Sequence, residues 1–139
     1  MPHNCIYCEN KAGLDALMVK VADLQVSTVY LFREQSHPGR CVVAYKDHIG
    51  QQFEISEADW LRFMQDARRV AVAIDRVFHP GKVNFGSYGD TGCHAHWHIV
   101  PKYADDFEWG GVFEMNPKRC YLSDEELAER VALLQAALA

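Results

Sequence analysis

The chain has 139 residues, a formal net charge of −5 and an apolar fraction of 49%. This length suits one domain with its own core, and the acidic balance argues against binding to a nucleic-acid backbone. No apolar run approaches the roughly 20 residues of a membrane-spanning helix. No signal peptide is visible, and the five scattered cysteines favour a reducing compartment, so we expect a cytoplasmic protein.

The first predicted elements are a short helix and two strands. Apolar residues recur at helical spacing near the start of the chain, namely Leu14, Leu17, Met18 and Val21. This spacing predicts a helix. Residues 26–32 and 41–45 are rich in β-branched and aromatic side chains, which is typical of strands, and the turn at residues 37–39 favours an antiparallel pair.

A long helix follows these strands. Ser56 and Asp59 form a capping-box-like start, and apolar side chains then recur with a period of about 3.6 from Trp60 to Phe78. His79-Pro80-Gly81 is expected to end the helix. Its aromatic and methionine stripe predicts core packing.

The remaining elements are a strand at residues 82–85, a glycine-rich loop at 86–92, a histidine-rich strand and a final helix. Ser123 is expected to cap that helix, whose apolar stripe comprises Leu127, Val131, Leu134 and Leu138. The order of the elements predicts a single α+β domain over residues 1–139, with a mainly antiparallel sheet.

Three histidines alternate with apolar residues in the segment 94–100. Successive side chains of a strand point to opposite faces, so His94, His96 and His98 are expected on one face. Pro101 is expected to end the strand because it has no N–H to donate. Clustered imidazoles titrate near neutrality and bind metal ions or phosphate oxygens.

The segment His94–Val100 resembles the signature of the histidine-triad superfamily, His-φ-His-φ-His-φ-φ with φ apolar. The flanking elements are also similar in order, over roughly residues 5–103. These proteins are hydrolases and transferases that act at the α-phosphorus of nucleotides. The resemblance implies a sheet of about five strands with a long helix across it, a C-terminal helix, and a homodimer.

The resemblance also implies the chemistry. It assigns the covalent nucleophile to His96, a hydrogen bond to the phosphate to His98, and a supporting role to His94. A neutral imidazole attacks phosphorus through its free ring nitrogen, so His96 needs its other nitrogen held as a donor, most simply to a backbone carbonyl. The expected substrate is a nucleoside phosphate ester, a phosphoramidate or a dinucleoside polyphosphate.

Substrate contacts are expected from the strand and loop before the triad. Asn84 matches an asparagine of the superfamily, and Ser87 and Thr91 offer hydroxyls beside backbone N–H groups. Two positions depart from the pattern. Asp90 stands where nucleotide-binding members usually have glutamine, and Phe32 stands where many have an acceptor for the ribose.

Cys5 and Cys8 form a Cys-x-x-Cys pair, which alone is compatible with a buried turn or a redox pair. Some histidine-triad proteins bind zinc through such a pair, a histidine after the second strand and the first triad histidine. The resemblance therefore implies a structural zinc site of Cys5, Cys8, His48 and His94.

Two other functions stay open from the sequence. A catalytic zinc held by His94, His96 and His48 would activate water in a metal-dependent hydrolase. Alternatively, the chain would be a zinc-stabilised module that binds nucleotides without turnover. The remaining histidines, His3, His37 and His79, are expected on the surface.

Overall fold

One antiparallel sheet, in the strand order β1-β2-β3-β5-β4, organises the computed structural model, which describes residues 5–139. The strands are β1 (Met18–Asp23), β2 (Ser27–Phe32), β3 (Cys41–Tyr45), β4 (Lys82–Gly86) and β5 (His96–Lys102). Every neighbouring pair is antiparallel. The predicted α+β class and antiparallel sheet are confirmed.

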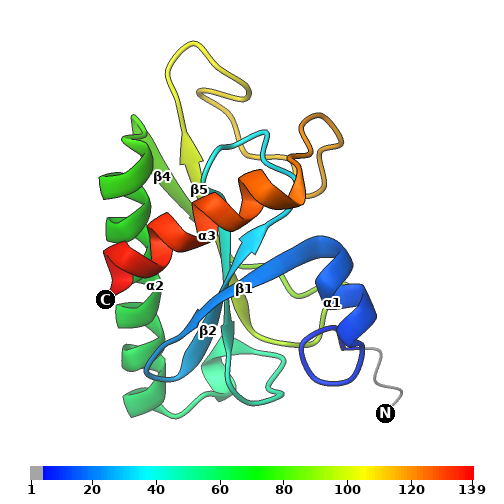
Figure 1. The fold of residues 1–139 in the computed structure, drawn as a ribbon. Coiled ribbons are helices and arrows are strands. Elements are labelled where there is room, and N and C mark those ends of the chain that lie inside the picture. The colour runs from blue at the N-terminus through cyan, green and yellow to red at the C-terminus, as the bar shows by residue number, and fades with distance from the viewer. Residues whose placement is uncertain (1–4) are drawn as a thin grey trace.

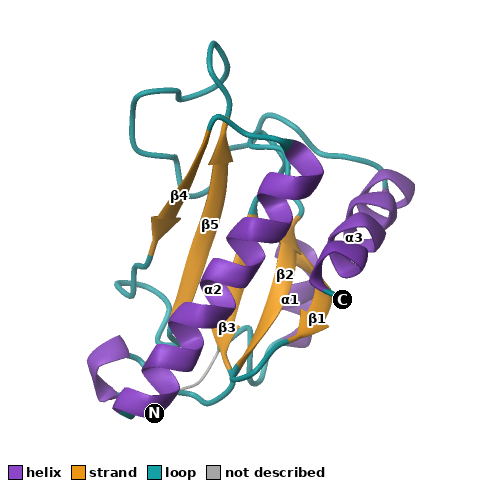
Figure 2. Cartoon of the chain, turned by 90° about the vertical axis from the view of Figure 1, so that its left-hand side faces the viewer, coloured by secondary structure: helices purple, strands orange, loops and turns teal. Residues whose placement is uncertain are grey.

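Three α-helices pack around this sheet. They are α1 (Lys11–Leu17), α2 (Glu57–Phe78) and α3 (Asp124–Leu138), with a short 3-10 helix at Gln52–Glu54. Figure 2 shows α2 running diagonally across one face of the sheet, α1 behind the sheet, and α3 beside β1. Figure 1 shows the loop after β5 extending beyond the end of the sheet. None of the helices in residues 5–139 is long and apolar enough to cross a membrane.

The two longer helices begin and end where their capping residues predict. Ser56 Oγ accepts a hydrogen bond from the Asp59 N–H at the start of α2, and His79 ends that helix in the left-handed region with φ 52°. At α3, Ser123 and Glu126 form a reciprocal capping box. These caps explain why both helix boundaries could be predicted to within a residue or two.

Apolar side chains cover both faces of the sheet. The face under α2 and α3 carries the main core, which includes Val43, Phe63 and Ile99. The opposite face carries a smaller cluster built on Met18, Phe32 and Val42, with Ile6, Tyr7, Leu14 and Tyr30 packed against it. We call this second face the histidine face, because His98 packs against Phe32 there.

The predicted first helix is wrong after Leu17. Met18 and Val21 lie in β1, where each is buried in a different cluster on a different face of the sheet. Because both faces are covered, apolar residues three positions apart in this strand imitate helical spacing. β1 is therefore a strand that the sequence pattern did not predict.

The predicted end of the histidine strand at Pro101 is also wrong, since β5 continues to Lys102. Beyond Ile99 this strand pairs with β4 and no longer with β3, so a proline there is tolerated as on an edge strand. The strand begins at His96, and His94 lies just before it.

His37 was expected on the surface, and that prediction is wrong. The side chain is 2% exposed, and its Nε2 atom lies 2.7 Å from the Glu108 carboxylate. The loop after β5 covers the turn that carries it, with Tyr103 donating to the Pro38 carbonyl oxygen. His79 is exposed as predicted, and His3 lies outside the described residues.

Candidate active site

A cavity of about 650 Å³ opens on the histidine face. This volume lies within the range of about 300–1,000 Å³ that is usual for small-molecule sites. Its lining includes an apolar group, namely Ile6, Leu17, Met18 and Phe32. It also includes all three histidines of the motif and part of the preceding loop, residues 88 and 90–93. The structure thus brings the three predicted histidines to one cavity.

His96 is half-buried at the start of β5. Its Nδ1 atom lies 2.7 Å from the carbonyl oxygen of His94. Because a carbonyl only accepts, Nδ1 carries the proton and Nε2 keeps its lone pair. Burial lowers the pKa of His96 below the ordinary histidine value, although this hydrogen bond acts in the opposite direction. The hydrogen bond expected for a nucleophilic histidine is therefore present.

His98 has the opposite arrangement. Its ring centroid lies 5.0 Å from that of His96, and its Nδ1 atom lies 3.1 Å from Nη2 of Arg40. A guanidinium only donates, so Nδ1 accepts and the ring proton sits on Nε2. Burial, followed by the charges of Arg40 and His96, lowers the pKa of His98 to about 3. His98 is therefore a neutral N–H donor at ordinary pH.

His94 makes a third arrangement. Its Nε2 atom lies 2.6 Å from the carbonyl oxygen of Tyr45, which places the proton on Nε2 and leaves Nδ1 bare. Nδ1 lies 3.5 Å from Cys5 Sγ and 3.4 Å from Cys8 Sγ. A histidine held in this way, with its second nitrogen on a carbonyl, has the orientation typical of metal ligands.

Four side chains converge beside His94 at the end of the cavity: Cys5, Cys8, His48 and His94. Their ligand atoms all lie within 4.8 Å of one another. In tetrahedral zinc sites with bonds of about 2.3 Å to sulfur and 2.0 Å to nitrogen, the sulfur–nitrogen edge is about 3.6 Å. The observed edges of 3.4–3.5 Å match this value, so the four residues fit a zinc ion.

Local backbone hydrogen bonds bring these four side chains together. The carbonyl oxygen of Cys5 accepts from the N–H groups of Cys8, Glu9 and Asn10, which closes a tight turn and brings the two thiols together. The Ala95 N–H donates to the Ile49 carbonyl at 2.7 Å, which holds the segment carrying His48 next to His94. Backbone hydrogen bonds therefore position ligands from three separate segments.

The predicted substrate-binding residues are divided by the fold. Thr91 lines the cavity, together with Asp90. Ser87 lies beside it and donates to the His96 carbonyl at 2.8 Å. Asn84 instead lines a second hollow with Phe85 and Tyr88, so the structure does not place it with the histidines.

Sequence reasoning missed several residues at this site. Arg40, Met115 and Asn116 had no predicted role, yet Arg40 contacts His98 and the other two line the cavity. A signal for Arg40 existed in the alternation along β3. Arg40 precedes Val42 by two positions, and Val42 faces the histidine side of the sheet.

Solved structures share this fold. A histidine triad protein from Bradyrhizobium japonicum superposes with a TM-score of 0.84 over 92% of this chain and 96% of its own, at 16% identity. A zinc-bound histidine triad family protein from Mycobacterium smegmatis gives 0.70 over 97% and 93%, at 21% identity. The chain therefore has the histidine-triad fold, and the resemblance seen in the His94–Val100 motif is confirmed.

A curated relative extends the comparison to a named activity. The adenosine 5′-monophosphoramidase of Schizosaccharomyces pombe is 23% identical over 138 residues, which cover 92% of this chain and 98% of that protein. No family model matches the chain.

Proposed function

We propose that this chain is a nucleotidyl hydrolase or transferase that cleaves its substrate at the α-phosphorus through a covalent intermediate on His96. The observation that carries the proposal is the contact of 2.7 Å between His96 Nδ1 and the His94 carbonyl oxygen. It leaves a neutral ring with the Nε2 lone pair available in a cavity large enough for a nucleotide.

The reaction proceeds in two displacements. Nε2 of His96 forms a bond to phosphorus while the bond to the leaving group breaks, and the leaving group departs with its electron pair and takes a proton from water. Water then attacks the phosphorus, the N–P bond breaks with its electrons returning to Nε2, and the remaining proton goes to solvent. The Nε2–H of His98 donates to a phosphate oxygen and stabilises the charge that develops there.

A nucleoside phosphoramidate is the favoured substrate class, ahead of phosphate esters and dinucleoside polyphosphates. The relative from Schizosaccharomyces pombe is named for such an activity. Among the residues of the segment 5–139 that line the cavity, the one with an ionisable carboxylate is Asp90, and no lysine or arginine is among them. Additional phosphates would find no cationic side chain on these walls, which favours a substrate with a single phosphate.

Zinc is proposed as a structural ion at Cys5, Cys8, His48 and His94. The sulfur–nitrogen spacing supports this, and so does a zinc-bound neighbour with the same fold. Four protein ligands leave no open position for water, and His96 is not in the cluster. These features favour a structural ion over the alternative of a catalytic zinc. When bound, the ion would cross-link the N-terminal turn to the segment that precedes the nucleophile.

A homodimer is proposed through the edge of β4. This strand ends the sheet, and large apolar side chains are exposed on it and beside it, namely Phe85, Tyr88, Trp109 and Val112. Exposed apolar groups on an edge strand are typical of an interface. Light scattering should give twice the mass of one chain, and Phe85→Lys should give the mass of one.

The test of the proposed function is hydrolysis of adenosine 5′-monophosphoramidate by wild-type protein, His96→Ala and His79→Ala. His79 is an exposed histidine away from the cavity and serves as the matched control. We expect His96→Ala to lower kcat/KM by at least about 1,000-fold and His79→Ala to leave it unchanged. Full activity in His96→Ala would refute the proposal, whereas binding of AMP without any turnover would support the non-catalytic alternative.

A further inference from the structure

Arg40 is an arginine buried beside the active site. It precedes β3, its side chain is 0% exposed, and it has the largest volume among the fully buried side chains. Its guanidinium carbon lies 4.2 Å from the ring centroid of Phe32 and 5.1 Å from that of Phe113. Such a site is expensive for a cation unless an anion is nearby.

No carboxylate forms an ion pair with Arg40 in residues 5–139. Its guanidinium donates to the carbonyl oxygens of Glu114 and Met115, at 3.2 and 2.9 Å, to Nδ1 of His98, and more weakly to Met115 Sδ at 3.8 Å. Its Nε atom is buried without a hydrogen-bond partner in the described part of the chain. Burial lowers the pKa of Arg40, and the more distant carboxylates of Glu34 and Glu108 act in the opposite direction. The groups in direct contact with the guanidinium in the described residues are neutral, and one of them is a ring of the active site.

The contact with His98 decides which nitrogen faces the cavity as a donor. Because Nη2 of Arg40 donates to Nδ1, the proton of the neutral ring must reside on Nε2. Without a donor at this position, Nδ1–H of His98 could instead bond to the carbonyl oxygens that Arg40 now occupies. The ring would then present a bare nitrogen to the cavity, which repels a phosphate oxygen.

We propose that Arg40 is a positioning residue for the transfer reaction, which holds His98 as its Nε2–H tautomer and places a positive charge behind that ring. The phosphate group of the substrate would lie on the other side of His98 and would meet this charge through the ring. This inference rests on the proposed function. Arg40 is not among the residues that line the cavity, so it acts through His98.

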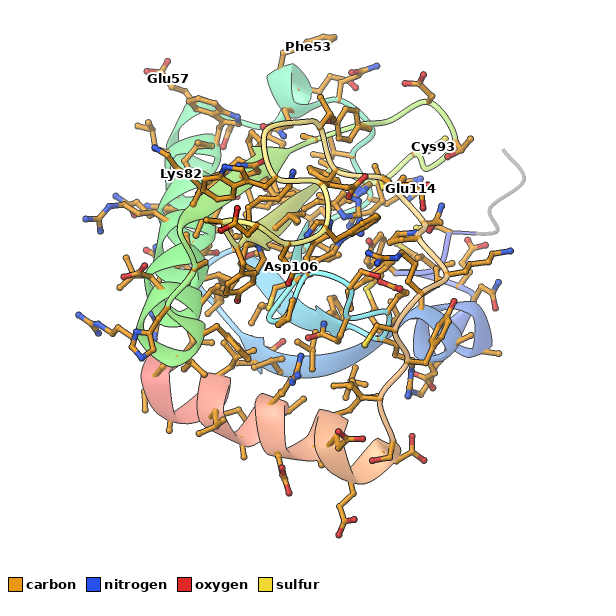
Figure 3. The ribbon with its side chains drawn as sticks, turned by 90° about the horizontal axis from the view of Figure 1, so that it is seen from above. Phe53, Glu57, Lys82, Cys93, Asp106 and Glu114 are labelled. Carbon is orange, nitrogen blue, oxygen red and sulfur yellow. The ribbon has the colours of Figure 1, made fainter. Side chains whose placement is uncertain are left out.

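Lys102 provides a matched control. It is also a buried cation, 2% exposed, and its Nζ atom donates to the carbonyl oxygens of Glu108 and Gly111 at 2.6 and 2.7 Å. These carbonyls belong to the same loop whose later residues, Glu114 and Met115, accept from Arg40. Figure 3 shows this loop, marked by Asp106 and Glu114, passing in front of the sheet. Lys102→Met therefore perturbs the loop while leaving the Arg40–His98 contact in place.

The first readout is spectroscopic and needs no substrate. Long-range ¹H–¹⁵N spectra at neutral pH report which ring nitrogen of each histidine carries the proton. In wild-type protein and in Lys102→Met, His98 should carry it on Nε2. In Arg40→Met the proton should move to Nδ1 in a large fraction of molecules. An unchanged His98 in Arg40→Met, or the same change in Lys102→Met, would overturn the inference.

The second readout is kinetic. Negative charge on the phosphate oxygens grows toward the transition state, so Arg40→Met should lower kcat about 10- to 100-fold and change KM less. Arg40→Gln, which keeps polar donors but no charge, provides a second variant should the methionine variant fail to fold, and it should also lose at least about 10-fold in kcat. A kcat within about 3-fold of wild type in the folded variants would contradict the inference.

The two proposals fail in different ways. If the wild-type protein turned over no nucleoside substrate, the proposed function would fail while the spectra still decided the role of Arg40. If turnover required His96 but ignored Arg40, the proposed function would stand and this inference would not.

Discussion

His94 and His98 are buried to a similar extent, 3% and 5% exposed, and they lie four positions apart in one motif. Both rings carry their proton on Nε2, but the partners of their two nitrogens differ. His94 meets a carbonyl at Nε2 and turns a bare Nδ1 toward two thiols, whereas His98 meets a guanidinium at Nδ1 and keeps its proton on Nε2. The same side chain is thus suited to bind a metal ion at position 94 and to donate to a phosphate at position 98, according to the partners of its two nitrogens.

His96 lies between His94 and His98 in the motif and has a third set of partners. Its carbonyl contact resembles that of His94, but it uses Nδ1, so the bare nitrogen is Nε2. Along the motif, His94 therefore has a bare Nδ1, His96 has a bare Nε2, and His98 has a protonated Nε2. Spacing alone explains why three rings lie together, and the partners explain why each has a separate role.

The largest effect is predicted for the zinc site that contains His94, and it concerns the free energy of unfolding. At a zinc concentration 1,000 times Kd, binding should raise the free energy of unfolding by about 4 kcal/mol. Cys8→Ser should remove this gain, because it removes one of the four ligands. Chemical denaturation with and without zinc, together with metal analysis, measures it. Cys120→Ser, outside the cluster, is the control, and equal zinc content in both variants would contradict the assignment.

The proposed hydrogen bond from His98 to the phosphate can be removed by substitution. Asparagine can keep an acceptor for Arg40, but it removes the N–H that faces the cavity. His98→Asn should therefore lower kcat on adenosine 5′-monophosphoramidate about 100- to 1,000-fold, the usual loss for one donor to a developing charge. Circular dichroism would verify folding. A loss below about 3-fold would show that His98 does not contact the reacting phosphate.

The difference in surroundings also predicts a smaller effect of pH on stability. The pKa of His98 is lowered to about 3 by burial and by the charges of Arg40 and His96, against about 6.5 in an unfolded chain. Between these values the unfolded chain binds a proton that native His98 does not. The free energy of unfolding should therefore fall as pH falls below about 6.5, by up to about 1.4 kcal/mol per pH unit.

Urea denaturation of wild-type protein and His98→Asn, both free of metal, isolates this contribution between pH 6.5 and 4.5. The variant should show the shallower dependence, because it lacks the titrating ring. Identical slopes would mean that His98 is protonated in the native state as readily as in the unfolded chain.

Much of the fold followed from local patterns. The cap at Ser56 and the periodic apolar residues located α2, and the composition of residues 41–45 located β3 at its observed bounds. β1 escaped prediction because both faces of the sheet are covered. Local periodicity then no longer distinguishes a strand from a short helix at Met18 and Val21.

The site was predictable only in part, for a related reason. The three histidines could be predicted as a group because they alternate within five residues of the sequence. The Arg40–His98 contact joins residues 58 positions apart, and the Arg40–Met115 contact joins residues 75 apart. Contacts of this kind leave no periodic trace in a single sequence. His37 was misplaced on the surface for the same reason, because the loop that buries it follows β5.

In the proposed mechanism Nε2 of His96 attacks the α-phosphorus. The most direct measurement is rapid quenching of wild-type protein with adenosine 5′-monophosphoramidate, followed by mass spectrometry of peptides under conditions that preserve phosphoramidates. A nucleotidyl adduct on His96 that disappears in acid and is absent from His96→Ala is the predicted result. An adduct on another residue, or turnover in His96→Ala at the wild-type rate, would contradict the account.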